Sequence, residues 1–396
     1  MRPTEVKGEI SVMPQPARAV VFHGVDSTLR IEDVLTPPPA DGEVRLDIAA
    51  CGACLSDVHK IEGHGLVEPP CVFGHENSGT VSAVGPGVDH LAVGDRVVCS
   101  FLVPCGRCPA CADGREDECG PFRSQMQRRG VRFDGSPRLS FADGTALRTS
   151  GVGGLATAIV MPATSVFRLP DGWPDHLPLA DAAVLGCAGL TGYGAVHRAA
   201  RLARGEHVAV LGAGGVGLCI VAFAKHAGAA SVLVTDMKPD ALDAAKKFGA
   251  TATSAATAAD LQARAAEAGG EAGPSVVFDT IGNEHTIRQA LDMVAIGGRV
   301  IVTGLAGTSG ASIDDVSVLV RRKVSLIGSY AGVPGQDMPA MLAAVAEGAL
   351  DPSALITARY GFEDAADAYT ALASGAVTGR AVIEMPSRPT SPRSSS

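Results

Sequence analysis

The stretch VAVLGAGGVG, residues 208–217, decides the fold of this 396-residue chain. Four apolar residues typical of a buried strand run directly into a series of spaced glycines. Gly212 permits a tight turn, Gly214 lets the backbone approach a pyrophosphate, and Gly217 lets the following helix pack closely on the strand. Gly215 and Val216 open that helix, whose free N–H groups and positive dipole end would face the phosphates. These five residues therefore predict a dinucleotide-binding loop.

An acidic residue follows at the position that this kind of loop requires. A second strand, residues 231–235, ends at Asp236, 19 residues beyond Gly217. A carboxylate there accepts hydrogen bonds from the adenosine ribose and repels a 2′-phosphate, which favours NAD over NADP. Lys238 lies close enough to weaken this preference. FAD uses the same glycine pattern, but usually near the start of a chain, whereas here the pattern lies in the middle.

The pattern of apolar residues changes along the chain. Residues 17–100 are rich in short β-prone runs, and residues 101–150 lose periodicity and gain Cys, Arg and Gly, which predicts a long functional loop. From about residue 177, Ala-rich helical segments alternate with short strands, which predicts a parallel sheet. The expected strands are 19–22, 43–50, 79–84, 96–100, 208–211, 231–235, 276–279, 299–303, 325–328 and 381–384, with late helices at 338–347 and 362–374. Residues 386–396 are Pro, Ser, Arg and Thr alone, and we expect a disordered tail.

Composition excludes several classes of protein. With 46% apolar and 19% charged residues the chain is not disordered, and its 48 glycines follow no period of three, so it is not collagenous. A net charge of −9 argues against nucleic acid as the main partner. We find no run of 18 apolar residues and no apolar signal core before residue 15, and we therefore expect no membrane span and a cytoplasmic location.

Four of the ten cysteines lie within one short segment. Cys105, Cys108, Cys111 and Cys119 follow one another at spacings of 3, 3 and 8 residues. Four thiolates so close together can enclose a zinc ion tetrahedrally and leave no position for water, which is typical of a structural site. An iron–sulfur cluster is the alternative, but the spacings do not match those of ferredoxins.

A further set of motifs is dispersed. CGACLSDVH occupies residues 51–59, GHENSG begins at Gly74 and is followed by Gly85 and Val88, and LGCAGLTGYG occupies residues 185–194. In these motifs, and in the order of the four-cysteine segment and the glycine loop, the sequence resembles the zinc-dependent medium-chain alcohol dehydrogenases. The resemblance covers about residues 17–385.

The resemblance implies a second zinc ion, with two per chain, and a proton relay. Cys54, His75 and Cys187 match the ligands of the family's catalytic zinc, a Cys₂His set that leaves one position open. Asp57 matches the carboxylate that orients His75, and Glu76 matches an acid that lies behind the zinc. Ser56 and His59 match the two ends of the relay that carries away the hydroxyl proton.

The resemblance also implies cofactor contacts. Thr191 matches a residue near the nicotinamide, and Arg380 matches an arginine that binds the pyrophosphate. Leu55 is a departure, because many members carry a basic residue there that also binds pyrophosphate. Loss of one cation is expected to loosen the cofactor and to speed its release.

The fold class implied is α/β, a β-rich GroES-like domain combined with a doubly wound Rossmann sheet. We expect a catalytic zinc-binding domain of residues 1–188 and 331–396, and an NAD-binding domain of residues 189–330 between them. The active site would lie at the carboxyl ends of the parallel strands. The expected activity is reversible hydride transfer between a primary or secondary alcohol and NAD, giving an aldehyde or ketone.

The long segment between Cys119 and Cys187 matches the long-insert, liver-type form of the family, which implies a homodimer, with a homotetramer as the alternative. Phe101 matches a pocket aromatic. Arg123 matches an arginine that thiol-adduct formaldehyde dehydrogenases use to hold a carboxylate, so that activity stays open, although His59 stands where the glutathione-dependent enzymes usually have tyrosine. A biosynthetic carbonyl reductase and a non-catalytic NAD-binding protein are further alternatives, and the retained Ser56 and His59 and the complete ligand set argue against them.

Overall fold

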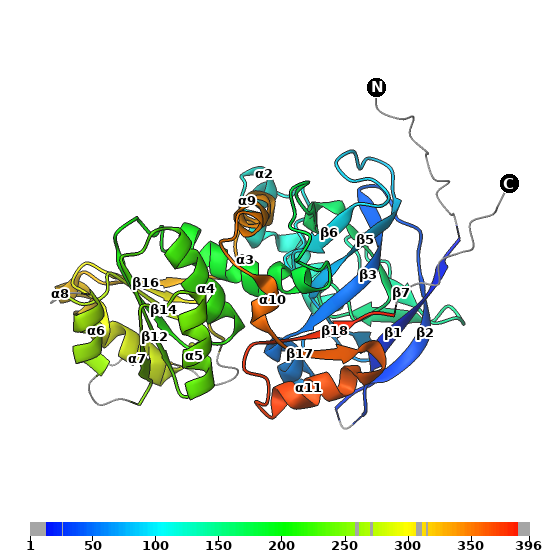
Figure 1. Ribbon diagram of the computed structural model, residues 1–396. Helices are drawn as coiled ribbons and strands as arrows, with labels where there is room; N and C mark the ends of the chain where they lie inside the picture. Colours follow the sequence, from blue (N-terminus) through cyan, green and yellow to red (C-terminus); the bar gives the residue numbers. More distant parts are fainter. Residues whose placement is uncertain are drawn as a thin grey trace.

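A computed structural model describes residues 13–25, 27–257, 261–269, 272–305, 311–313 and 316–386. Two bodies of secondary structure stand side by side in Figure 1, one of them built around the middle third of the chain and the other around the two ends. The predicted tail lies outside the described residues from 387 onward. Among the helices of the described ranges, none has the length and apolar character needed to span a membrane.

Six parallel strands form the sheet of the first body, in the order β13-β12-β11-β14-β15-β16. This is the doubly wound order, with the strand order reversing beside β11, the strand that precedes the glycine loop. The central strands are buried on both faces, as expected of parallel strands covered by helices, so the predicted α/β class is confirmed. The strands are β11 (His207–Leu211), β12 (Ser231–Asp236), β13 (Ala252–Ala255), β14 (Val276–Asp279), β15 (Arg299–Val302) and β16 (Ser325–Gly328).

Helices connect these strands and cover the sheet. Gly214 is the N-cap of the helix that follows β11 directly, and a capping box between Asn283 and Thr286 begins the helix after β14. Asp279, at the end of β14, accepts a hydrogen bond from the Thr286 hydroxyl and so ties that helix to its strand. The helices are α4 (Gly215–His226), α5 (Pro239–Phe248), α6 (Leu261–Gly269), α7 (Glu284–Met293) and α8 (Ser317–Arg322).

The second body holds a closed barrel and a seven-stranded sheet. The sheet runs β10-β6-β5-β3-β18-β17, with β9 also pairing with β3. Its β18, the last of the described strands, lies beside β3, from the first quarter of the chain. The sheet strands are β3 (Glu43–Ala53), β5 (Glu76–Val84), β6 (Arg96–Cys99), β9 (Ala158–Pro162), β10 (Val166–Arg168), β17 (Ile356–Gly361) and β18 (Arg380–Glu384). The barrel strands are β1 (Gln15–Phe22), β2 (Arg30–Thr36), β4 (Cys71–Val72), β7 (Leu139–Ser140) and β8 (Ala146–Thr149).

Residues 101–150 are more ordered than the predicted loop. β7 and β8 lie within this range and help to close the barrel, and three short helical segments precede them. Sequence periodicity cannot reveal strands of two and four residues, because so short a run shows too few alternations. The helical segments are α2 (Pro109–Ala112), η2 (Glu116–Glu118) and η3 (Phe122–Gln127).

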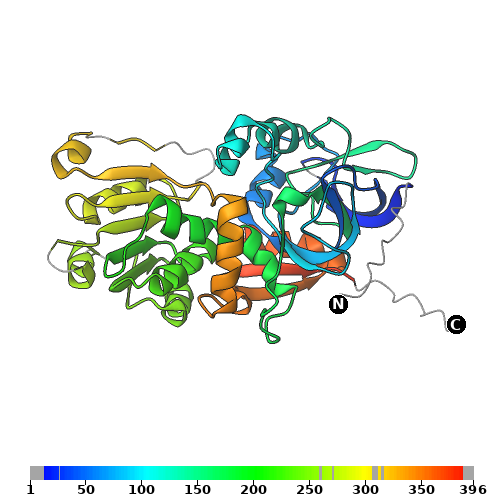
Figure 2. The same ribbon diagram turned by 90° about the horizontal axis from the view of Figure 1, so that it is seen from above.

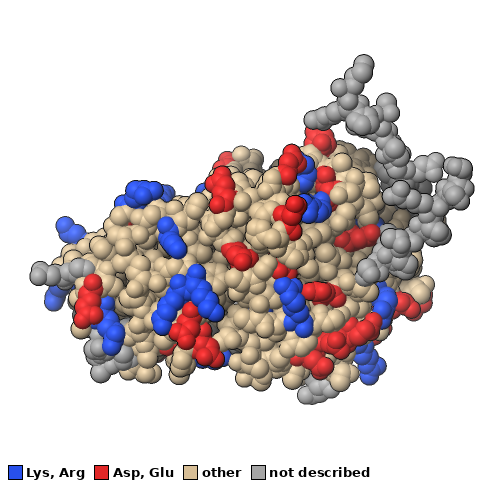
Figure 3. Space-filling view, in the orientation of Figure 1, with Lys and Arg blue, Asp and Glu red and all other residues tan. Residues whose placement is uncertain are grey.

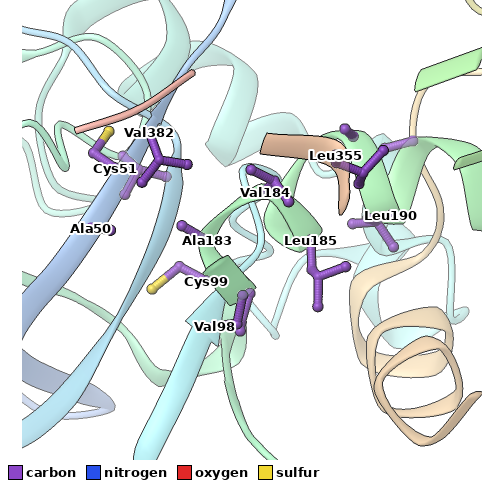
Figure 4. Packing of buried hydrophobic residues seen from close by; sticks show 14 of the residues in the cluster. Ala50, Cys51, Val98, Cys99, Ala183, Val184, Leu185, Leu190, Leu355 and Val382 are labelled. Atoms are coloured by element: carbon purple, nitrogen blue, oxygen red, sulfur yellow. The ribbon is translucent and has the colours of Figure 1, made fainter. Parts of the chain in front are cut away.

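Several helices join the two bodies or cover the second one. Figure 2 shows α9 (Pro334–Ala346) between the two bodies, where it contacts α3 (Ala188–Gly194). The turn η5 (Asp181–Gly186) packs against the seven-stranded sheet, and Figure 4 shows its Ala183, Val184 and Leu185 close to Val98 and Leu355. The remaining helical elements are α1 (Leu55–His59), η1 (Lys60–His64), η4 (Ala163–Ser165), η6 (Ala195–Ala199), α10 (Pro352–Leu355), η7 (Phe362–Asp364) and α11 (Ala365–Ala373).

We predict that Asp181 is a major determinant of stability at neutral pH. Its carboxylate, 1% exposed, accepts hydrogen bonds from Arg359 at 2.6 and 2.8 Å. Burial opposes ionisation, but Arg359 outweighs it and lowers the pKa of Asp181 below its usual value. Asp181→Asn should therefore lower the free energy of unfolding by about 1–3 kcal/mol near pH 7.

Denaturant unfolding across pH checks this. Because the folded-state pKa of Asp181 is depressed, its stabilisation is present above the unfolded-state pKa and is lost as pH falls through the folded-state value. The difference between wild type and variant should stay constant from pH 8 to about 5 and shrink below about 4. Asp171→Asn, in a solvent-exposed pair with Arg168, is the matched control and should change stability by less than about 0.5 kcal/mol.

Candidate functional site

Four side chains able to bind a metal meet between the sheet and η5. The ligand atoms of Cys54, His75, Glu76 and Cys187 all lie within 4.8 Å of one another. Cys54 directly follows β3. His75 directly precedes β5, and Glu76 is the first residue of that strand. Cys187 lies between η5 and α3. The pairing of β3 with β5 sets Gly52 opposite Glu76, so the register of the sheet brings the first three together.

Glycine at position 52 is required by this closeness. A Cβ atom on Gly52 would lie 2.3 Å from the Glu76 carboxylate and 2.8 Å from its Cβ. Any larger residue would push Glu76 away from the cluster. The packing of the Glu76 side chain therefore explains why glycine stands at position 52, between Cys51 and Cys54.

A buried carboxylate orients His75. The Nδ1 atom of His75 lies 3.1 Å from Asp57 Oδ2, so its Nε2 is directed to the other side, 3.4 Å from Ser56 Oγ. Asp57 has no exposed side-chain surface, and its other oxygen accepts a hydrogen bond from Lys60 Nζ at 2.7 Å. Burial alone would raise the pKa of Asp57, but His75 and Lys60 lower it to about 2. Tyr369 also donates a hydrogen bond to Asp57 Oδ2, at 3.5 Å.

Protons are distributed unevenly among the four ligands. The Cys187 thiol beside Cys54 lowers the pKa of Cys54 well below its usual value, and Cys54 together with burial raises the pKa of Cys187 well above its own. Burial disfavours the charged imidazole of His75, but Asp57 and Cys54 outweigh it and raise the pKa of His75 to about 10. Burial raises the pKa of Glu76 to about 7, although Arg380 opposes the shift. A metal must displace protons from Cys187 and His75, so metal affinity here falls as pH falls.

The donor set fits zinc. Two thiols and an imidazole whose far nitrogen is held by a carboxylate are the ligands of a Cys₂His catalytic zinc site, with one position left for water or substrate. Glu76 lies against the same cluster, and its carboxylate forms an ion pair with Arg380 at 2.9 Å. The structure therefore brings together Cys54, His75, Cys187, Asp57 and Glu76.

The four-cysteine segment forms a second cluster. The Sγ atoms of Cys105, Cys108, Cys111 and Cys119 lie within 4.8 Å of one another, and those of Cys108 and Cys119 are 3.9 Å apart. Thiolates about 3.8 Å apart are what a tetrahedron with Zn–S bonds of about 2.3 Å requires. All four are free cysteines, so the donor chemistry fits a structural zinc ion.

This cysteine lobe is attached to the helix between the two bodies. Glu116 accepts a hydrogen bond from the backbone N–H of Gly335 at 2.6 Å, and Gln336 Nε2 donates one to the carbonyl of Gly114 at 3.0 Å. Gly335 and Gln336 belong to the first turn of α9. The lobe therefore supplies two hydrogen-bond acceptors to the first turn of α9.

The glycine loop has the backbone that a dinucleotide needs. Gly212 has a φ of +93°, in the left-handed region, and a Cβ on Gly217 would lie 2.0 Å from the Gly212 carbonyl oxygen. Nothing lies within 4 Å of a Cβ position on Gly214, which leaves that face open. A Cβ on Gly215 would lie 2.2 Å from Arg380 Nε, so the guanidinium of Arg380 packs directly on the loop. Val216 follows in the first turn of α4.

Asp236 lies beside this loop at the carboxyl end of β12. Its carboxylate accepts hydrogen bonds from the backbone N–H of Ala213 at 2.8 Å and of Lys238 at 2.9 Å. Lys238 Nζ donates to the carbonyl of Gly375 at 2.8 Å, across the cleft in the segment that leads to β18. Asp236 is therefore held next to the first glycine, where an adenosine ribose would lie.

The two predicted relay residues share a short helix. Ser56 and His59 are three residues apart on α1, a spacing that places side chains on the same helix face. Ser56 Oγ lies 3.4 Å from Cys54 Sγ, whereas the ring of His59 is directed to Glu62, with Nδ1 3.5 Å from its carboxylate. Ser56 therefore lies beside the cluster of metal-binding side chains, whereas the side chain of His59 is 38% exposed to solvent. No direct hydrogen bond between them is found in the described structure.

The predicted pocket residues are only partly brought to the cluster. The Phe101 ring makes an edge contact with His75 at a centroid distance of 6.0 Å, and Thr191 is buried on α3, where its N–H bonds to the carbonyl of Cys187. Arg123 is exposed, and its guanidinium donates to the carbonyl of Asp117 at 3.4 Å. Leu55 is 49% exposed.

Tyr330 is a site residue that the sequence analysis missed. It follows β16, and its ring meets Phe101 edge-on at 5.5 Å, while its hydroxyl accepts a hydrogen bond from Gln127 at 3.3 Å. No motif contains Tyr330 or Gln127, and only the fold brings them together. Lys60 was also missed, although its i,i+3 spacing from Asp57 on a helix was a usable signal.

Comparisons with known proteins agree with this geometry. Residues 40–171 match the family model described as alcohol dehydrogenase GroES-like domain, and residues 215–347 match the one described as zinc-binding dehydrogenase. An NDMA-dependent alcohol dehydrogenase of Amycolatopsis methanolica is 31% identical over 365 residues, which cover 90% of this chain and 96% of that protein. An S-(hydroxymethyl)glutathione dehydrogenase of Escherichia coli is 29% identical, covering 91% and 97%. A crystal structure of an alcohol dehydrogenase zinc-binding domain protein from Burkholderia ambifaria superposes with a TM-score of 0.87 at 26% identity, covering 95% of this chain and all of that one.

A two-body α/β fold in which a Cys₂His cluster faces a dinucleotide loop defines a class of oxidoreductase. This chain belongs to the zinc-dependent medium-chain alcohol dehydrogenase family. The predicted family and fold are thereby confirmed.

We predict that Asp57 strengthens metal binding through His75. Asp57→Asn should weaken zinc binding at the Cys54, His75 and Cys187 cluster by about 10- to 100-fold, because the imidazole loses the carboxylate that orients it. With a pKa of about 2, Asp57 is fully ionised at pH 8, where the comparison should be made.

Competition with a chromogenic chelator measures this affinity. Asp89→Asn is the matched control, because Asp89 also lies beside a histidine, His90, but is 99% exposed. Equal zinc affinity in wild type and Asp57→Asn would show that Asp57 does not support the metal ligand.

Proposed function

We propose that this protein catalyses reversible hydride transfer between a primary or secondary alcohol and NAD, with two zinc ions per chain. Cys54, His75 and Cys187 would hold the catalytic ion, and the four cysteines of the lobe the structural one. The observation that carries this proposal is the position of Arg380. Its guanidinium pairs with Glu76 at the cluster of metal-binding side chains and packs on Gly215 of the glycine loop, so the two sites adjoin each other.

Bound zinc would supply a Lewis acid that lowers the pKa of an alcohol hydroxyl, and bound NAD would supply the hydride acceptor. The ring of Phe101 lies against His75 and that of Tyr330 against Phe101, so both would contact the carbon chain of a bound alcohol. Arg380 offers a positive charge to the pyrophosphate, and Thr191, near Cys187, is assigned to the nicotinamide end. Leu55 adds no cation, which favours faster release of the cofactor.

Ser56 is the residue placed to receive the hydroxyl proton. Its Oγ lies 3.4 Å from both Cys54 Sγ and His75 Nε2, at the edge of the ligand set. His59, on the same helix face and open to solvent, is the natural outlet. Because no direct hydrogen bond joins them in the described structure, the proton must cross through a bridging group such as water or a cofactor hydroxyl.

Formaldehyde bound as a thiol adduct is the second candidate substrate. Several relatives are named S-(hydroxymethyl)glutathione dehydrogenases, and Arg123 matches the arginine assigned to the adduct carboxylate. Rates with formaldehyde in the presence and absence of glutathione distinguish this candidate, because a thiol-dependent enzyme is inactive without the thiol. The same machinery run in reverse is a carbonyl reductase, and the ratio of rates in the two directions tests that role.

We further propose two domains, a catalytic domain of residues 1–188 and 331–396 and an NAD-binding domain of residues 189–330. The protein would act on a small molecule in the cytoplasm and bind neither nucleic acid nor membrane. It would form a homodimer, with a homotetramer as the alternative. Light scattering of the purified protein gives the oligomeric state directly.

Asp236 should make the enzyme prefer NAD. A 2′-phosphate beside this carboxylate would be repelled and would lose the ribose hydrogen bonds, a difference of roughly 2 kcal/mol or about 30-fold in kcat/KM. Asp236→Asn removes the charge and should reduce the preference by about 10-fold. Asp240→Asn, on the first turn of α5, is the control and should leave the ratio unchanged. A wild-type preference for NADP would contradict this assignment.

Ser56→Ala should lower kcat by roughly 100-fold or more, because loss of a proton-transfer group typically costs about 10²–10⁴-fold. NAD binding, measured by calorimetry, should stay near that of wild type. Ser124→Ala, exposed on η3, is the matched control. Full activity of Ser56→Ala with a simple alcohol would show that the proton leaves by another route.

A further inference from the structure

Lys60 carries a positive charge next to the carboxylate that orients His75, and the proposed function leaves it without a role. Its Nζ donates a hydrogen bond at 2.7 Å to Oδ1 of Asp57, whose other oxygen faces the imidazole of His75. Among the described residues, Lys60 is the only lysine or arginine within ion-pair distance of Asp57. The side chain of Asp57 has no exposed surface, whereas that of Lys60 is 26% exposed.

The burial of Asp57 distinguishes this ion pair from those at the surface. On the face drawn in Figure 3, Lys and Arg lie among Asp and Glu at the solvent, where water screens the charges and an ion pair contributes little. The Asp57 carboxylate has no surface open to water, so each of its oxygens depends on donors from the protein. Burial opposes the ammonium form of Lys60, but Asp57 outweighs it and raises the pKa of Lys60 above its usual value. Lys60 therefore stays charged beside Asp57.

The two oxygens of Asp57 have different partners. Oδ2 lies 3.1 Å from Nδ1 of His75 and accepts a hydrogen bond from the Tyr369 hydroxyl at 3.5 Å. Among the described side chains, Oδ1 accepts a hydrogen bond from Lys60 alone. The torsion that turns a carboxylate about its own axis has only a broad preference. Because Lys60 binds the oxygen that His75 does not, it fixes the rotation of the carboxylate.

Local backbone structure holds Lys60 in this position. Lys60 is the C-cap residue of α1, and its backbone N–H donates to the carbonyl of Asp57, three residues earlier. The chain then turns at Gly63, which has a φ of +97°. This turn brings Gly65 to the lysine stem, since a Cβ on Gly65 would lie 3.3 Å from the Cβ of Lys60 and 3.6 Å from its Cγ. The stem is therefore packed within its own turn, which limits the positions open to its ammonium group.

We propose that Lys60 is a positioning residue for the metal site, which holds Oδ1 of Asp57 and so keeps Oδ2 directed at His75. A ligand histidine whose other nitrogen is held binds a metal more tightly, because its ring is already oriented. Without Lys60, a buried oxygen of Asp57 would lack its donor, and the carboxylate would turn away from the orientation that serves His75. This inference rests on the proposed catalytic zinc ion at the Cys₂His cluster.

The two ways in which Lys60 can affect a zinc ion have opposite signs. As a positive charge alone, Lys60 would repel the ion, so its removal would strengthen zinc binding. As a positioning residue it supports His75 through Asp57, so its removal would weaken zinc binding. The zinc affinity of the Cys₂His cluster therefore distinguishes the proposal from a general electrostatic effect.

Lys60→Met removes the charge and keeps most of the apolar stem. We expect it to weaken zinc binding at the Cys₂His cluster by about 3- to 10-fold at pH 8, less than the roughly 10- to 100-fold that follows when a partner in direct contact with a ligand is lost. Competition with a chromogenic chelator measures this affinity, and the zinc ion of the cysteine lobe is an internal reference whose affinity should stay the same. Lys60→Arg, which keeps a charged donor, should retain the wild-type affinity within about twofold.

Lys246→Met is the matched control. Lys246 forms an ion pair with Asp243 at 2.8 Å over the same i,i+3 spacing, but both side chains are exposed. This variant removes the same charge from a lysine distant from the metal site in sequence, and it should leave the zinc affinity of the Cys₂His cluster unchanged.

A double-variant cycle tests whether Lys60 acts through Asp57. In the Asp57→Ala background, Lys60→Met should no longer weaken zinc binding, because the carboxylate that Lys60 holds is gone. The inference is wrong if Lys60→Met binds zinc as tightly as wild type or more tightly, if the loss is the same with and without Asp57, or if Lys60→Arg loses as much affinity as Lys60→Met. In each of these cases the proposed function stands. Wild-type protein that binds no zinc at the Cys₂His cluster would instead reject the proposed function itself.

Discussion

One buried guanidinium joins the two halves of this protein. Arg380 has almost no solvent exposure, and its only compensating charge among the described side chains within ion-pair distance is Glu76. Burial opposes the charged form, but Glu76 and the two ligand cysteines raise the pKa of Arg380 above its usual value, so it stays ionised. A buried charge of this kind tolerates little displacement, because losing its partner leaves it without compensation. Arg380, at the start of β18, therefore contacts both the cluster of metal-binding side chains and the glycine loop.

How much of the site could be predicted from the sequence depends on how local its signals are. The glycine loop and the four cysteines each lie within a few residues, where spacing alone determines which groups can meet. Cys54, His75 and Cys187 are far apart along the chain, and no spacing relates them. Their grouping followed only from resemblance, and the fold explains it through the register of β3 and β5 and the packing of η5.

Three of the residues that sequence reasoning missed share one property. Tyr330, Gln127 and Tyr369 come from segments with no motif, and only the tertiary fold brings them to their partners. The short strands β7 and β8 were missed for a different reason, because they gain their stability from closing a barrel rather than from their own periodicity. Such tertiary effects do not appear in any window of the sequence.

The position of β18 also has a consequence for how the chain reaches its native state. This strand is synthesised after the other described strands, yet it inserts between β3, from the first part of the chain, and β17. During synthesis the seven-stranded sheet therefore keeps an unpaired edge at β3 until β18 is made, and closing so long a loop is entropically slow. Exposed edges of this kind invite pairing with other chains. Arg380 therefore joins the glycine loop only after the other described strands have been synthesised, and a chain that stops short of β18 would have both an open sheet edge and no guanidinium beside that loop.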